Sequence, residues 1–154
     1  MKNETTIEQT SERELSITRT FDGPVRLVWE AWTTPKLFGR WWLPKSFGLT
    51  LISCEQDIRV GGMYKLVIKH GDAEPRAFFG KYLEVVPTSR LVWTNEEDPN
   101  AATTTVTFEE HGSQTRVVMR DLYPTKAALD EARETQQYDG MGETFDQLAA
   151  VLAS

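Results

Sequence analysis

The stretch Phe38-Gly39-Arg40-Trp41-Trp42-Leu43-Pro44 places two adjacent tryptophans just before a proline. Four of the five tryptophans of the chain lie between Trp29 and Trp42. A small domain that places this much aromatic surface in a connection indicates that the connection covers an apolar space. We therefore expect Trp41 and Trp42 either to gate the mouth of a cavity or to plug the core.

The segments before this stretch predict one strand and two short helices. Residues 14–21 alternate apolar and polar side chains, which is typical of a half-buried strand. Val25, Val28 and Trp32 recur at the spacing of one helical face. The first helix should end at Thr34, because the residue before a proline avoids the helical conformation, and a second helix should follow over residues 35–42.

The segments after it predict six strands joined by short turns. Gly61 and Gly62 supply the positive φ angles that a tight hairpin turn requires. Connections this short favour antiparallel neighbours, since parallel strands need a long crossover. The expected strands are residues 49–58, 64–69, 77–86, 91–95, 103–110 and 115–122.

A long helix is expected at the end of the chain. It opens near Pro124, and Asp139–Gly142 is expected to weaken or kink it. Phe145, Leu148 and Leu152 then form an apolar stripe. About seven antiparallel strands and this helix predict an α+β fold in which a curved sheet wraps round the helix. Incomplete closure would leave a concave, mostly apolar space between them, as ligand sites require.

Composition narrows the class of protein. A chain of 154 residues should form one domain, assigned here to residues 13–154 with a polar, flexible tail over residues 1–12. A net charge of −6 without a basic run disfavours nucleic acid and anionic membranes as partners. No apolar run approaches the roughly 18 residues of a membrane span, and residues 1–14 lack the apolar core of a signal peptide. The single cysteine of the chain, Cys54, excludes an internal disulfide. We therefore expect a cytoplasmic protein.

The polar residues offer little catalytic chemistry. His70 and His111 fall in predicted loops without the spacing of a zinc site, so we expect no metal and no cofactor. Glu55 and Asp57 share one face of a strand, where burial would raise at least one pKa. The alternative is an exposed face, or an ion pair with Arg59.

The apolar candidates for a binding site lie in the connection that carries the tryptophan pair, on the predicted strands and on the last helix. Aromatic and methionine side chains at such positions suit a hydrophobic ligand, although each one alone could be ordinary core. The candidates are Trp32, Trp41, Trp42, Phe47, Met63, Phe79, Trp93, Phe108, Met119, Tyr123, Met141, Phe145 and Leu148.

Five segments carry a resemblance to a known family: residues 21–33, 40–42, 57–64, 80–87 with 90–94, and 139–148. In this order they resemble the START-like (SRPBCC) superfamily, in its branch named after activators of the heat-shock-protein-90 ATPase. The resemblance covers about residues 14–153 and implies a helix-grip (START/Bet v-like) fold with a cavity between the long helix and the sheet. Met141 stands where this family usually has tryptophan, and it either opens one end of the cavity or fills an irregular gap.

These observations predict non-covalent binding of a small hydrophobic molecule, with Trp41 and Trp42 at the entrance. Two alternatives come from other classes of protein: a protein-binding domain that acts as a chaperone cofactor, and an enzyme that uses a polar group of the cavity for proton transfer. Members of the resembled family differ in what they bind, so the fold alone does not choose among the three. Assembly into a homodimer is also left open.

Overall fold

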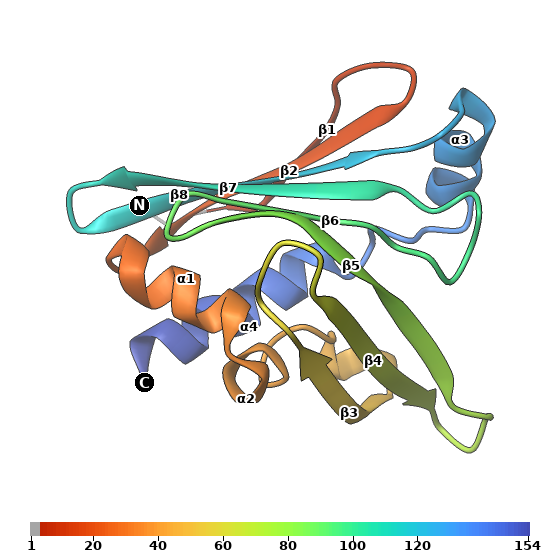
Figure 1. Cartoon of the computed structure of the whole chain (residues 1–154), viewed down its shortest axis with the longest axis horizontal. Coiled ribbons are helices and arrows are strands. Elements are labelled where there is room, and N and C mark those ends of the chain that lie inside the picture. Colours follow the sequence, from red (N-terminus) through yellow and green to blue (C-terminus); the bar gives the residue numbers. More distant parts are fainter. Residues whose placement is uncertain (1–3) are drawn as a thin grey trace.

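Strands and helices follow the expected order in the computed structural model, which describes residues 4–154 (Figure 1). The strands are β1 (Thr6–Gln9), β2 (Glu14–Asp22), β3 (Leu49–Gln56), β4 (Met63–His70), β5 (Arg76–Val86), β6 (Arg90–Trp93), β7 (Thr103–His111) and β8 (Gln114–Leu122). The helices are α1 (Val25–Thr33), α2 (Pro35–Phe38), α3 (Lys126–Glu134) and α4 (Met141–Ala153), with a short 3-10 turn, η1 (Lys45–Phe47).

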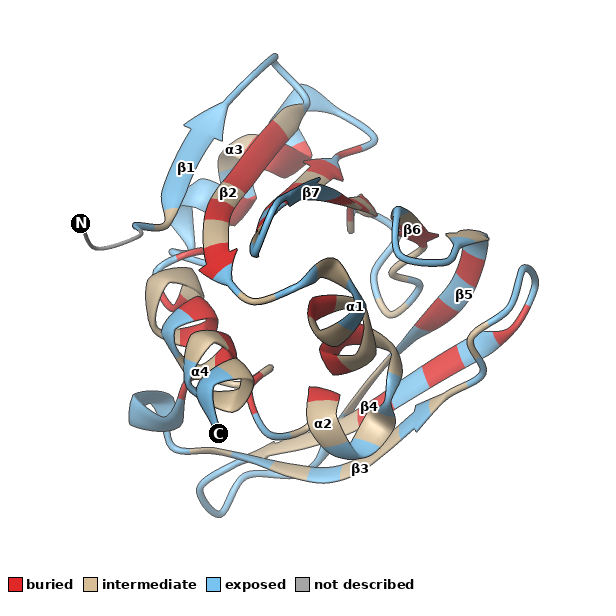
Figure 2. Ribbon diagram, turned by 90° about the vertical axis from the view of Figure 1, so that its left-hand side faces the viewer, coloured by how far each residue is buried: buried red, intermediate tan, exposed pale blue. Residues whose placement is uncertain are grey.

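The architecture is α+β with a curved antiparallel sheet, consistent with the helix-grip fold. Within the described residues the sheet has eight strands in the order β1-β2-β8-β7-β6-β5-β4-β3. Figure 2 shows α1, α2 and α4 inside the curve of this sheet. The core therefore lies between the concave face of the sheet and these helices, and the binding space predicted from the sequence would lie on the same side.

The first strand corrects the expectation for the N-terminus. The expectation of a flexible tail over residues 1–12 is wrong for Thr6–Gln9, which pair antiparallel with Leu15–Thr18 of β2. This additional strand brings the number of strands among the described residues to eight, rather than about seven. All four side chains of β1 are exposed, so backbone pairing and not burial holds the strand. The first three residues of the expected tail lie outside the described residues.

The helical segments also differ from the prediction. The expected long helix is two helices, α3 and α4, because Thr135–Gly140 forms a turn in which Gln136 adopts a positive φ of 60°. The apolar stripe predicted on α4 is confirmed, since Phe145 and Leu148 are fully buried. Helix α2 ends at Phe38 rather than Trp42, and turns continue the chain to Pro44.

One glycine allows neighbouring strands to approach closely at the bend of the sheet. Gly80 of β5 is buried, and a Cβ atom there would lie 2.0 Å from the carbonyl oxygen of Thr94. The same oxygen lies 2.7 Å from the hydroxyl of Tyr64, so the contact also positions a residue of β4. Only a hydrogen atom fits at this position.

Gly80→Ala is expected to lower the free energy of unfolding by at least about 2 kcal/mol, because β5 and the segment after β6 must separate. Gly142→Ala is the matched control: a Cβ atom at this position of α4 would meet nothing within 4 Å, and alanine favours a helix by up to about 1 kcal/mol. Urea denaturation measures both variants. Equal stabilities would contradict the close approach at Gly80.

Candidate functional site

A cavity of about 390 Å³, here called the main chamber, lies between the concave face of β3–β6 and the α1–α2 region. Its volume is within the usual range of small-molecule sites, roughly 300–1,000 Å³. Most of its wall consists of aromatic rings and aliphatic chains. The lining residues are Trp32, Phe38, Trp42, Leu43, Leu49, Gln56, Tyr64, Leu66, Ile68, Phe78, Tyr82, Trp93, Asn95 and Gln137.

A second chamber of about 320 Å³ adjoins the first. The two share the wall formed by Trp42, Leu49, Phe78, Trp93, Asn95 and Gln137, so a molecule in one chamber lies next to the other. The second chamber is more polar. Its other lining residues are Pro44, Phe47, Glu97, Ala101, Ala102, Thr104, Met119, Asp121, Tyr138, Gly140, Met141 and Thr144.

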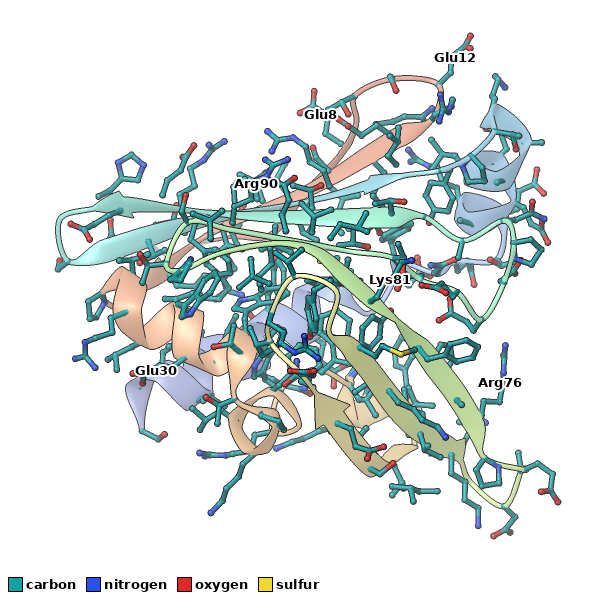
Figure 3. All side chains as sticks on the ribbon, in the orientation of Figure 1. Glu8, Glu12, Glu30, Arg76, Lys81 and Arg90 are labelled. Carbon is teal, nitrogen blue, oxygen red and sulfur yellow. The ribbon has the colours of Figure 1, made fainter. Side chains whose placement is uncertain are left out.

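The two chambers differ in charge. None of the described residues that line the main chamber carries a formal charge, whereas Glu97 and Asp121 line the second. Other charged side chains, such as Glu8, Glu12 and Arg76, extend from the periphery (Figure 3). The main chamber is therefore an apolar space with a few neutral polar groups.

Two of these neutral groups, the side chains of Gln56 and Tyr82, contact each other in the wall of the main chamber. The Nε2 atom of Gln56 lies 3.3 Å from the carbonyl oxygen of Trp32 and 3.3 Å from the hydroxyl of Tyr82. Neither the Oε1 atom of Gln56 nor the indole N–H of Trp32 has a hydrogen-bond partner within residues 4–154. Burial raises the pKa of Tyr82, so its hydroxyl keeps its proton at neutral pH.

A chain of hydrogen bonds connects the main chamber to the second. The hydroxyl of Tyr64 lies 2.9 Å from Oδ1 of Asn95, whose Nδ2 donates to Oγ1 of Thr104 at 3.1 Å. Thr104 in turn donates to Oδ1 of Asp121 at 2.7 Å. The hydroxyl of Tyr138 donates to the other carboxylate oxygen at 2.6 Å. Buried polar groups that are paired in this way hold the surrounding wall in one arrangement.

Asp121 is the buried acid of this chain. Burial raises its pKa, although the hydrogen bonds from Tyr138 and Thr104 oppose the shift. Burial also raises the pKa of Glu97. Neither acid is among the residues predicted from the sequence, yet a signal exists for Asp121, because it follows Val117 and Met119 at the period-two spacing of the buried face of β8.

Residues 22–153 match the family described as Activator of Hsp90 ATPase homolog 1-like protein. The chain belongs to this family. No curated protein matches it. The match agrees with the resemblance noted from the sequence, and it covers every strand and helix that lines the two chambers.

Solved structures with the same fold come from several bacteria. A protein from Rhodobacter sphaeroides has a TM-score of 0.89 at 23% identity, over 97% of this chain and 98% of that chain. A protein from Nitrosomonas europaea has a TM-score of 0.85 at 27% identity, over 94% and 97%. A protein from Mycobacterium smegmatis has a TM-score of 0.82 at 23% identity, over 97% and 98%. In this member of the family, the described residues form no helix long and apolar enough to cross a membrane.

The predicted site residues fall into three groups. Trp32, Trp42 and Trp93 line the main chamber, and Phe47, Met119 and Met141 line the second together with Trp42 and Trp93. Five others are buried without lining either chamber: Trp41, Phe108, Tyr123, Phe145 and Leu148.

Met63 and Phe79 form the third group, and the expectation that they face the cavity is wrong. They are 60% and 37% exposed and lie on the outer face of β4 and β5. Their neighbours Tyr64 and Phe78 point inward, and adjacent residues of a strand face opposite sides. The pair Phe78-Phe79 carries two aromatic rings in succession, so hydropathy alone could not tell which one faces inward.

The two tryptophans of the opening stretch have different surroundings. Trp41 is fully buried, and its indole N–H donates to the carbonyl oxygen of Ala31 at 3.0 Å. Trp42 is half-buried, lines both chambers and stacks on Phe38 with ring centroids 4.7 Å apart. Trp41 therefore has the position of a core plug, and only Trp42 has the position that a gate requires.

The C-terminal helix holds this segment through side-chain hydrogen bonds. Gln147 donates from Nε2 to the carbonyl oxygens of Trp41, at 2.9 Å, and Leu43, at 2.7 Å. Glu143 accepts hydrogen bonds from the backbone N–H, at 2.8 Å, and the hydroxyl of Ser46. These bonds lower the pKa of Glu143. Residues 41–46 are thereby fastened to α4.

The polar candidates from the sequence lie away from both chambers. Nε of Arg59 lies 2.9 Å from Oδ2 of Asp57, which is the ion pair of the alternative interpretation, and both residues are exposed, as is Glu55. His70 and His111 are also exposed, and they are the last residues of β4 and β7 rather than parts of the expected loops.

The residues that could bind a metal ion and the thiol of Cys54 were also considered as sources of chemistry. Across residues 4–154 no cluster of three His, Cys, Asp or Glu side chains could hold a metal ion. Cys54 is half-buried, and burial raises the pKa of its thiol to about 11, so it remains protonated at neutral pH.

The raised pKa of Asp121 predicts a specific dependence of stability on pH. The folded protein keeps this proton at pH values where the unfolded chain has lost it, so the folded state binds more protons and stability falls as pH rises through that window. Asp121→Asn removes the titration. The free energy of unfolding of this variant, relative to the original protein, should rise as pH increases above about 4.

Denaturant unfolding at a series of pH values measures this difference. Asp72→Asn, which removes an exposed loop carboxylate, is the control for the change in net charge. A difference between Asp121→Asn and the original protein that stays constant with pH would contradict the prediction.

Proposed function

We propose that this protein binds a small hydrophobic molecule non-covalently in the main chamber and acts in the cytoplasm. The observation that carries the proposal is a cavity of about 390 Å³ whose wall is mostly aromatic and aliphatic and carries no formal charge among its described residues. Burial of apolar surface there contributes roughly 25 cal/mol per Å². The single Cys54, which excludes an internal disulfide, is in keeping with a reducing compartment such as the cytoplasm.

Three aromatic residues are assigned the ligand contacts. Trp42, Phe78 and Trp93 line both chambers, so their rings are available to a ligand in either space. Aromatic rings combine a large apolar area with geometric preferences for stacked or edge-on contacts, which suits a ring-containing ligand. Trp41 has a supporting role, because it fills the core behind this wall.

Ligand binding is expected to raise the melting temperature of the protein with at least one member of a panel of indole, naphthalene and decanol. A ligand at 100 times its dissociation constant stabilises the folded state by about 2.7 kcal/mol. Trp42→Ala should weaken binding, whereas Trp41→Phe should lower stability with little change in affinity. Calorimetry well below the unfolding temperature measures both affinities. The proposal fails if no compound of a broad apolar panel binds the original protein.

Protein binding is a second candidate function, favoured by one observation. The outer face of β3–β5 exposes Ile52 and Met63 by 50% and 60%, and Phe79 lies on the same face. The family is named after an activator of the Hsp90 ATPase, so Hsp90 is the partner to consider for this face. Lys65, which pairs with Phe79 across the strands, gives the surface a charged component.

This candidate predicts measurable binding to Hsp90 from the same organism and a change in its ATPase rate. Met63→Ser with Phe79→Ser should abolish that binding and leave the binding of naphthalene unchanged, because neither side chain lines a chamber. Leu122→Ser, which alters an exposed apolar residue of β8, is the matched control. The absence of any interaction at micromolar concentrations would remove this candidate.

A further inference from the structure

The two chambers meet at a wall that is one layer of side chains thick. Trp42, Phe78 and Trp93 line both spaces, so no second layer of residues lies between the chambers at these rings. Trp42 is only half-buried and follows the end of α2, outside any helix or strand. Exposed side chains change rotamer within nanoseconds, so this ring is the movable part of the wall.

The second chamber offers both apolar surface and a wet polar end. Phe47 and Met141 line it and do not line the main chamber. A ligand that continues from the main chamber would bury its chain against them, and each buried methylene raises affinity about fourfold. Asn95 and Glu97 of the same lining are half-buried and Gln137 is exposed, so a polar group at this end keeps polar neighbours and water.

The sign of the charge in the second chamber limits that polar group. Glu97 and Asp121 line the chamber, and no lysine, arginine or histidine is among the described residues that line either chamber. Burial raises the pKa of Glu97, and the charge of Arg76 opposes this shift from outside both linings. An anionic end would lose hydration without gaining a counter-ion, whereas an uncharged end avoids this cost.

Two residues on opposite walls set how far a ligand can extend. Met141, the first residue of α4, and Ala101, in the connection between β6 and β7, both line the second chamber and not the main one. Methionine is unbranched and flexible, so it adapts to a chain that lies against it. A larger side chain at either position would fill the second chamber and leave the lining of the main chamber unchanged.

We propose that one elongated ligand with an uncharged polar end occupies both chambers, with its apolar part in the main chamber and its polar end in the second, and that Met141 limits its length. The inference rests on the proposed function, because its apolar part occupies the same main chamber. It goes further by assigning the second chamber to the same ligand and by naming a residue that determines specificity.

Three alcohols and one carboxylate test the inference by calorimetry at neutral pH. The probes are 1-hexanol, 1-decanol, decanoate and decahydro-2-naphthol, which has ten carbons like 1-decanol but a compact shape. We expect 1-decanol to bind at least about tenfold more tightly than 1-hexanol, because it buries more methylene groups. It should also bind at least about tenfold more tightly than decanoate, whose charge would be buried without a partner.

Variants separate the two chambers. Met141→Trp should weaken the binding of 1-decanol at least about fivefold and change the affinity for decahydro-2-naphthol less than about twofold, because the compact alcohol remains in the main chamber. Ala101→Leu should have the same effect from the opposite wall. Leu122→Trp is the matched control, because this exposed residue of β8 lines neither chamber. Circular dichroism identifies a variant that does not fold, and the other variant then decides.

The outcomes separate this inference from the proposed function. Binding of decahydro-2-naphthol together with an unchanged affinity for 1-decanol in the folded variants would overturn the inference and leave the proposed function standing. An equal loss for both alcohols would also overturn it, since these residues would then act on the main chamber. Equal or tighter binding of decanoate than of 1-decanol would do the same. Failure of all four probes together with the whole apolar panel would overturn both proposals.

Discussion

The packing of Trp32 against its aromatic neighbours joins the parts of the fold that enclose the chambers. Its ring lies 4.7 Å from Trp41, 6.1 Å from Trp93, 5.9 Å from Phe108 and 6.3 Å from Phe145, measured between ring centroids. These contacts connect α1 to the tryptophan segment, to β6 and β7, and to α4. Each such pair contributes about 0.5–1.5 kcal/mol beyond the burial of area. The same side chain that centres the core also forms part of the main chamber, so stability and binding share one residue.

Much of the fold could be predicted because its signals are local. Alternating side chains identify β2, and the spacing of Phe145 and Leu148 identifies the buried face of α4. The glycines before Met63 identify a turn, although only Gly61 has the expected positive φ, whereas Gly62 allows a close approach to the carbonyl oxygen of Asp57. Short connections then require antiparallel pairing, which leads to a curved sheet around helices. The position of the chambers follows from that arrangement, and Trp32, Trp42 and Trp93 could be found in this way.

The remainder depends on contacts between distant residues, which no local pattern contains. Strand β1 exists through backbone pairing with β2, and its exposed side chains carry no apolar alternation. The expected weak point at Asp139–Gly142 overlaps the turn at Thr135–Gly140 that separates α3 from α4, but the full break was not predicted, because Gln136 is an unusual residue for a positive φ angle. The period-two spacing places Asp121 on the inward face of β8, but its role needs more than that spacing, because a buried carboxylate looks unfavourable until Thr104 and Tyr138 are known to donate to it.

The attachment of residues 41–46 to α4 has a consequence for the time scale of ligand exchange. This segment carries Trp42, Leu43 and Pro44, which form part of the chamber walls, and its backbone is fastened by Gln147 and Glu143. A ligand that leaves past this wall must wait for several hydrogen bonds to break together. The frequency of local opening of this segment would then set an upper limit on its dissociation rate, whatever the strength of its own contacts.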